Sequence, residues 1–416
     1  MDYRFNYKTG RYKALAFVCL CFFTPTAYAQ DTYKKSAFIK EIKSNMKNKA
    51  YARVTDNVRS ALQKFPDVVS IDPEYYYYNI QACHALALEE EKKMYLGQKA
   101  DTVKYFDYVY TVFTDGTRCD SLANIPNQKG RVLNSYYKHI LSLISDNMAK
   151  LPAGARFSFQ KKNYQRAYDY ATMFLRIAED SLRFQQCKAP AAEVHSTSAI
   201  AVLSAYAQGK YRDALPHLPM ALNENTRHRQ ILEIACRCYE GVGDTLHFEH
   251  SLSDGVSRYP SDSYFFLSLV KLYNDQHRYA DVLEQTKRML QIDSQNRDLW
   301  YIRGKEETYL SRDDEALQSF VTATEIKTDD AESYSAIGNI YLNMSRKAYE
   351  QQSGLTGKNL QNKKNELHNL YLKSKAAFES ARQYKPQDTA LWLSGLKEIY
   401  FKLNMGKELK AIEKMR

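Results

Sequence analysis

The sequence predicts an all-α protein, built as a right-handed solenoid of antiparallel helix pairs. Its 416 residues include only 15 glycines and 10 prolines, fewer than the many turns of a β-rich fold require. In the second half, residues of similar size recur every 34 residues, and a constant period of this length is typical of stacked helix pairs. Hydrophobic residues make up 44% and charged residues 26%, which excludes a disordered chain and a multi-span membrane protein.

Residues 1–29 have the layout of a secretory signal peptide. Basic residues precede the apolar run 14–23, and Ala27-Tyr28-Ala29 has the small-x-small pattern of a cleavage site. An uncleaved anchor is less favoured, because the run is about half of the roughly 20 residues that a spanning helix needs. A lipid anchor is also less favoured, since no small-residue box directly precedes the early cysteines. We therefore expect an exported, periplasmic chain, cleaved near Ala29 and without a membrane span.

Residues 30–182 are expected to form irregular helical repeats. A first unit begins near Lys35, with residues of the appropriate size at Tyr51, Val54, Ala61 and Pro66. The Asp-Pro step at 72–73 marks a helix start, because aspartate caps a helix and proline fits its first position. Further helices are expected over residues 74–95, 100–113, 129–150 and 164–180. We expect 118–129 to be the least structured loop and 151–154, which contains a proline and a glycine, to interrupt the helices.

Residues 195–388 hold the regular repeats, whose 34-residue units start at His195, Arg229, Ser263, Arg297 and Ala331. Positions 8, 20 and 27 of a unit are small, since two helices approach closely only where small residues face each other. Gly304 and Ala316 hold positions 8 and 20 of the fourth unit. In the second unit Phe248 stands at position 20 and Gly255 at position 27, so we expect the glycine to offset the bulk of the phenylalanine.

The last unit contains an insert. The residues that fit its second helix come 24 residues late, which places the insert at about 345–370. Its polar composition and the segment Gly354–Gly357 predict a long helical hairpin with a glycine turn at its tip. Residues 389–416 are expected to form the helices that cap the array.

Together these residues resemble the tetratricopeptide repeat. The family has Gly at position 8, Tyr at 11, Ala at 20, an aromatic at 24 and Pro at 32, and here these are Gly304, Tyr239, Ala316, Phe320 and Pro260. Lys161-Lys162-Asn163-Tyr164 and Leu403–Glu408 are similar to segments of exported tetratricopeptide proteins of the Bacteroidetes type. The resemblance implies a binding scaffold in which surface residues determine the partner.

No catalytic motif supports an enzyme. The sequence lacks the Gly-x-Ser-x-Gly, His-Glu-x-x-His and complete phosphate-loop patterns. The net charge of +11 is spread along the chain, without a stripe of arginines and interleaved aromatics, so we expect no nucleic-acid partner. The sequence predicts a non-enzymatic protein without a cofactor.

One group of residues could ligate a metal. Cys236, Cys238, His247 and His250 lie within 15 residues of one another. Two residues apart on a helix, the cysteines point about 200° away from each other and cannot share one ion. We expect them to pack as small hydrophobic residues, with no metal site. Five cysteines follow the predicted signal, and this odd number argues against a full disulfide framework.

The inner groove of the array is the expected binding face. In the family, positions 2, 5, 9 and 12 of the first helices line it, and the contacts that we predict from those positions are Arg237, Tyr264, Lys271, Tyr301 and Lys305. Tyrosine offers large contact area at low entropic cost, and basic neighbours favour an acidic protein or peptide partner. The chaperone-binding form of the family holds a carboxylate with Lys at 5 and Asn at 9, a pair that this sequence lacks. The alternative is an envelope carbohydrate-binding protein that uses exposed tyrosines, for which Tyr75–Tyr78 are further candidates.

Overall fold

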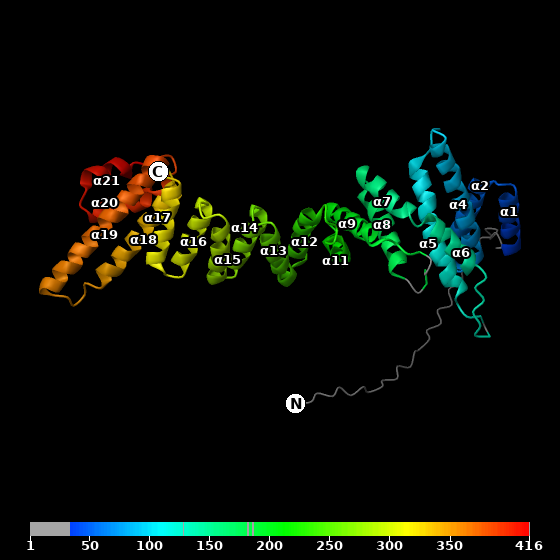
Figure 1. Ribbon diagram of the computed structural model, residues 1–416, viewed down its shortest axis with the longest axis horizontal. Helices are drawn as coiled ribbons and strands as arrows, with labels where there is room; N and C mark the ends of the chain where they lie inside the picture. Colours follow the sequence, from blue (N-terminus) through cyan, green and yellow to red (C-terminus); the bar gives the residue numbers. More distant parts are fainter. Residues whose placement is uncertain (1–33, 128, 181–182, 185–186, 416) are drawn as a thin grey trace, which may run out of the picture. The chain divides into compact units, whose positions relative to one another are not determined.

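The computed structural model describes residues 34–127, 129–180, 183–184 and 187–415 (Figure 1). Every regular element in these residues is a helix, which confirms the predicted all-α fold class. In the same residues, no helix has the length and apolar character needed to cross a membrane. The predicted signal peptide lies outside the described residues.

The chain divides into two compact units, Met1–Lys150 and Leu151–Arg416. This division lies before residue 182, where the sequence places the end of the irregular repeats. The physical reason is that α8 (Tyr164–Glu179) packs against α9 (Ala191–Ala207), which opens the regular array. In addition, the hydroxyl of Tyr168 in α8 donates a 3.2 Å hydrogen bond to the backbone oxygen of Asp213.

The first unit contains, in its described part, α1 (Lys35–Lys47), α2 (Tyr51–Lys64), α3 (Pro66–Val69), α4 (Pro73–Tyr95), α5 (Thr102–Ala123) and α6 (Tyr137–Asn147). The start of α4 follows the sequence prediction, since the Asp72 carboxylate accepts a 3.1 Å hydrogen bond from the backbone N–H of Glu74. Ile42, Val54 and Tyr75 are fully buried in the core that α1, α2 and α4 share.

The sequence prediction ends the helix at 113 and starts the loop at 118, and both positions are too early. α5 continues to Ala123 because one face of its second half is buried: Gly116 lies against Ile140 and Ile144, and Cys119 is fully buried. Residues 118–123, half of the stretch 118–129, are therefore helix, and the helix ends before the irregular residues 124–127.

The expected interruption at 151–154 is also absent. These residues belong to α7 (Lys150–Gln160), in which Pro152 lies in the first turn. Proline is tolerated there because the N–H groups of a first turn have no acceptor within the helix.

In the second unit, helix pairs follow one another along the chain from α9 onward (Figure 1). The first helices after α9 are α12 (His228–Val242), α14 (Ser263–Asp275), α16 (Arg297–Tyr309) and α18 (Ala331–Glu350). Their partners are α13 (Thr245–Arg258), α15 (Tyr279–Ile292), α17 (Asp313–Ile326) and α19 (Gly357–Tyr384). Four of the five first helices start within one residue of the predicted positions; α9 starts earlier, at Ala191.

The partner of α9 is broken into short pieces. They are α10 (Tyr211–Ala214), the 3₁₀ turn η1 (Leu215–His217) and α11 (Leu218–Ala221). Pro216 and Pro219 cause the break, since neither has an N–H to continue the hydrogen-bond ladder.

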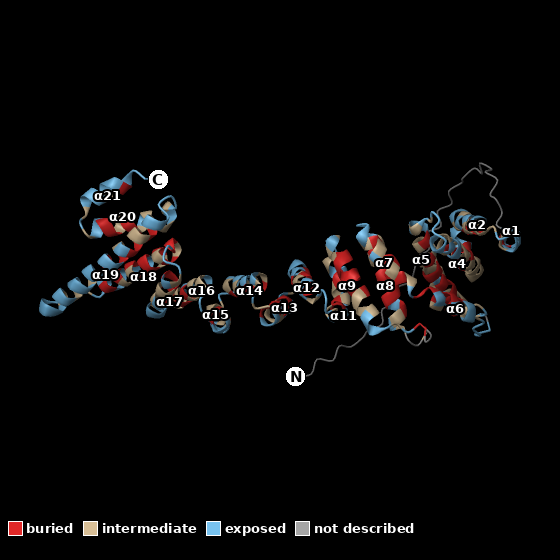
Figure 2. Ribbon diagram, turned by 45° about the horizontal axis from the view of Figure 1, so that its top comes forward, coloured by how far each residue is buried: buried red, intermediate tan, exposed pale blue. Residues whose placement is uncertain are grey.

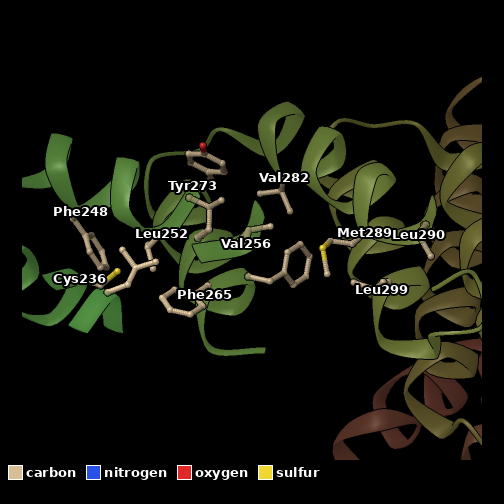
Figure 3. Packing of buried hydrophobic residues seen from close by; sticks show 13 residues of the cluster. Cys236, Phe248, Leu252, Val256, Phe265, Tyr273, Val282, Met289, Leu290 and Leu299 are labelled. Carbon is tan, nitrogen blue, oxygen red and sulfur yellow. The ribbon is translucent and has the colours of Figure 1, made fainter. Parts of the chain in front are cut away.

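Small residues sit where helices touch, as the repeat register requires. Ala316 is fully buried, and a methyl group added to Gly304 would lie 2.8 Å from the ring of Phe320. The role expected for Gly255 needs correction, because the ring that occupies its space is Phe265 of the following helix, at 2.2 Å from an added methyl carbon. Figure 3 shows the resulting core, which continues from Cys236 in α12 to Leu299 in α16.

Replacing Gly255 with alanine should destabilise the array by about 1–3 kcal/mol, because Phe265 is fully buried and its ring must shift. Gly406 offers a matched control, since nothing lies within 4 Å of a methyl group added there. Thermal unfolding should show a lower melting temperature for Gly255→Ala than for the parent, and an unchanged melting temperature for Gly406→Ala. Equal melting temperatures would contradict the packing.

The insert forms a hairpin of two long helices. α18 ends at Glu350 and α19 begins at Gly357, with Gly354 in a left-handed conformation (φ 80°) in the turn between them. The end of the hairpin is exposed, as Figure 2 shows. The chain closes with η2 (Thr389–Leu391), α20 (Leu393–Lys402) and α21 (Gly406–Glu413).

Candidate functional site

A groove lies between α12 and α14, with a cavity of about 280 Å³. It brings together three of the predicted contacts, Arg237 from α12 with Tyr264 and Lys271 from α14. The register explains this: the ninth position of one first helix lies beside the second position of the next. We call this cavity and its lining residues the α12–α14 groove.

Arg237 and Tyr264 form one wall of the groove. The guanidinium carbon of Arg237 lies 5.0 Å from the centre of the Tyr264 ring, within the range of a cation–π contact. Arg237 also donates a 2.8 Å hydrogen bond to Glu233, one turn earlier on α12. The guanidinium is therefore held between the Tyr264 ring and the Glu233 carboxylate.

Tyr264 is half-buried. Its ring packs edge-on against Phe265, with 5.2 Å between ring centres. Burial raises the pKa of the Tyr264 hydroxyl, so this group is neutral and available as a hydrogen-bond donor at physiological pH. Tyr264 thus contributes to the core and presents a polar edge to the groove.

The charges of the groove are mixed. Lys271 is exposed, and the carboxylates of Glu240 and Asp275 line the same cavity as the two cations. The groove can therefore pair with acidic and with basic groups of a ligand. Sequence reasoning missed the carboxylate of Asp275 and the buried ring of Phe248 as lining residues, although Phe248 stands at a position that is usually small.

Tyr301 and Lys305 do not line this cavity. Tyr301 is half-buried, covered by the guanidinium of Arg297 at 4.7 Å, and packs edge-on against Phe320. Lys305 is exposed on α16. The structure thus gives Tyr301 a packing role and leaves Lys305 on the surface.

A polar bridge joins α14 to α16. The amide nitrogen of Asn274 donates a 3.0 Å hydrogen bond to the carboxyl of Glu306, which is buried. Burial raises the pKa of Glu306. The bridge connects the two helices that carry four of the five predicted contacts. Tyr264 and Lys271 lie on α14, and Tyr301 and Lys305 lie on α16.

An apolar cleft of about 290 Å³ lies on the other side of α14, between this helix, α15 and α16. Leu267 and Ile292 line it and are 51% and 64% exposed, respectively. Asp293 and Asp298 also line it.

The other candidates are used for packing. Tyr75 is fully buried, Tyr76 is nearly so, and the hydroxyl of Tyr77 lies 2.9 Å from Nδ1 of His139. Cys236 and Cys238 belong to two different core clusters, so they do not face one ligand. Burial raises the pKa of Cys236 to about 12 and that of Cys238 to about 11, which keeps both thiols neutral.

No family model and no curated protein matches the chain. Among solved structures, it is similar to the MamA protein, with a TM-score of 0.34 and 16% identity over 45% of this chain and 88% of that chain. It is similar to YrrB, described as a TPR protein with an unusual peptide-binding site. The TM-score is 0.33, with 15% identity over 48% of this chain and 91% of that chain. The C-terminal part of a TPR repeat-containing protein from Cytophaga hutchinsonii gives a TM-score of 0.40 and 13% identity, over 63% of this chain and 95% of that chain. These similarities are low, so the fold assignment rests on the helix pairs and the register of the chain itself.

Proposed function

We propose that this protein is a non-enzymatic scaffold that binds a protein or peptide partner in the α12–α14 groove. The observation that carries the proposal is the convergence of Arg237, Tyr264 and Lys271 on one cavity. Tyrosine and arginine are enriched among the hot spots of protein interfaces, and the exposed Lys271 adds a positive charge beside them. Lys305, which is exposed on α16, extends the proposed surface, whereas Tyr301 supports it from below through its packing against Phe320.

We further propose that the chain works in the periplasm after cleavage near Ala29, and that its partner carries acidic groups. The layout of residues 1–29 supports export. Arg237 and Lys271 support an acidic partner, which must also present a donor or a cation to Glu240 and Asp275. The carbohydrate-binding alternative is less favoured, because Tyr75–Tyr78 are used within the first unit and not exposed.

Reversing the charge of Lys271 should weaken partner binding at least about tenfold, which corresponds to about 1.4 kcal/mol. The mature protein, immobilised, would capture partners from an extract of its own cell envelope, and the recovered proteins would be quantified by mass spectrometry. Lys287→Glu is the matched control, since Lys287 is also exposed but lines neither cavity beside α14.

The expected result is a protein that the parent and Lys287→Glu capture and Lys271→Glu does not. Recovery of the same proteins in the same amounts by both variants would place binding outside the α12–α14 groove.

A further inference from the structure

The first unit contains a cavity of about 450 Å³ between α2, α4 and α5. Its volume lies within the roughly 300–1,000 Å³ that is usual for small-molecule sites. Val58 and Cys83 line it and are nearly inaccessible to solvent, at 1% and 3% exposure. The cavity thus has an apolar, closed base, and burial raises the pKa of the Cys83 thiol to about 12, so this group packs and does not react.

A hydrogen bond joins two of the helices that form the cavity. The amide nitrogen of Asn79 in α4 donates a 2.6 Å hydrogen bond to the carboxyl of Asp115 in α5. The amide oxygen of Asn79 is buried, so a ligand in the cavity does not reach it. The Asn79–Asp115 pair therefore holds α4 against α5, and other lining residues must recognise a ligand.

Two cations, Arg59 and Lys104, line the cavity. Arg59 lies 3.2 Å from Asp56, and Lys104 lies 3.4 Å from Asp101. All four side chains are largely exposed, and exposed pairs of this kind contribute little, so either cation can turn toward a ligand. With Asp107, Arg59 and Lys104 give the lining an excess of positive charge.

We propose that this cavity binds a small carboxylic acid, of about the size of a sugar acid. Its carboxylate pairs with Arg59 and Lys104, since the guanidinium fork matches a carboxylate in geometry. The carbon skeleton lies against the half-buried ring of Tyr108. This site shares no residue with the α12–α14 groove, so it does not depend on the function proposed there.

Isothermal titration of the mature protein with D-galacturonate tests the site, with D-galactose as the neutral comparison. The charge variant is Arg59→Gln with Lys104→Gln. The matched control is Arg53→Gln with Lys99→Gln, two exposed cations of the same unit that do not line the cavity. Circular dichroism verifies that both variants are folded.

We expect saturable binding of D-galacturonate by the parent and by the control. Binding should be at least about tenfold weaker for D-galactose and for the charge variant, because each lacks one side of the carboxylate pair. No saturable binding by the parent would overturn the proposal, as would equal binding of the two sugars or full affinity in the charge variant.

Discussion

Replacing Phe378 with alanine should lower the stability of the C-terminal end of the array by about 3–5 kcal/mol. Phe378 lies in α19 and is 1% exposed. Its ring occupies the space left by two glycines on neighbouring helices, Gly338 in α18 and Gly395 in α20. A methyl group added to Gly338 would lie 2.9 Å from the ring, and one added to Gly395 would lie 2.3 Å from it. Neither glycine has a side chain that could fill the void.

Phe401 is the matched control, because it is a phenylalanine of α20 that is 69% exposed. Phe401→Ala should unfold like the parent, since little apolar surface is lost from the core. Hydrogen exchange should be faster in α20 and α21 for Phe378→Ala, because this ring connects α20 to the hairpin. If α20 kept its protection in Phe378→Ala, the ring would not anchor the C-terminal helices.

The 34-residue register was sufficient to predict where helices touch in the second unit. Gly304, Ala316 and Phe320 meet as their positions require, since the spacing of small and large residues determines which faces can approach. The register did not identify the partner of Gly255. That position accepts Phe265 of the next helix, and a size pattern within one repeat carries no information about which neighbouring ring fills the space.

In the first unit, local signals were misleading because distant contacts override them. Nothing near Gly116 in the sequence indicates that Ile140 and Ile144 cover it and allow α5 to continue. At the start of the second unit, Pro152 is a local signal for a break, but it lies in the first turn of α7, where a proline interrupts no hydrogen bond within the helix.

The sequence predicted part of the candidate site. Periodicity placed Arg237, Tyr264 and Lys271 on one surface, and the cavity between α12 and α14 contains all three. Periodicity could not show that Tyr301 packs under Arg297, because that contact depends on side-chain orientation. The cavity of the first unit had no sequence signal, since Arg59, Asn79 and Lys104 come from helices without a shared period.

An ion pair recurs in two units of the array, in which an arginine at the first position pairs with an aspartate at the last position. Arg229 donates a 2.6 Å hydrogen bond to Asp262, and Arg297 donates a 2.5 Å hydrogen bond to Asp330. The two pairs differ in burial. The side chains of Arg229 and Asp262 are 50% and 17% exposed, whereas those of Arg297 and Asp330 are 14% and 2% exposed.

Replacing Asp330 with asparagine should therefore destabilise the array by about 3 kcal/mol, because it leaves the Arg297 guanidinium buried beside a neutral amide. The expected loss is at the lower end of the range for broken buried pairs, since Glu332 and Asp298 still accept hydrogen bonds of 2.7 Å and 2.9 Å from Arg297. Asp262→Asn is the matched control: it makes the same change at the same repeat position, in an exposed pair whose loss should cost less than about 1 kcal/mol. The Asp262 side chain also caps α14, whereas Asp330 makes no side-chain cap hydrogen bond. Asparagine can cap a helix as aspartate does, so the cap of α14 is kept in Asp262→Asn. Thermal unfolding of the two variants compares the same substitution in a buried and in a more exposed pair; equal losses would mean that the Arg297–Asp330 pair is no more important than its exposed counterpart.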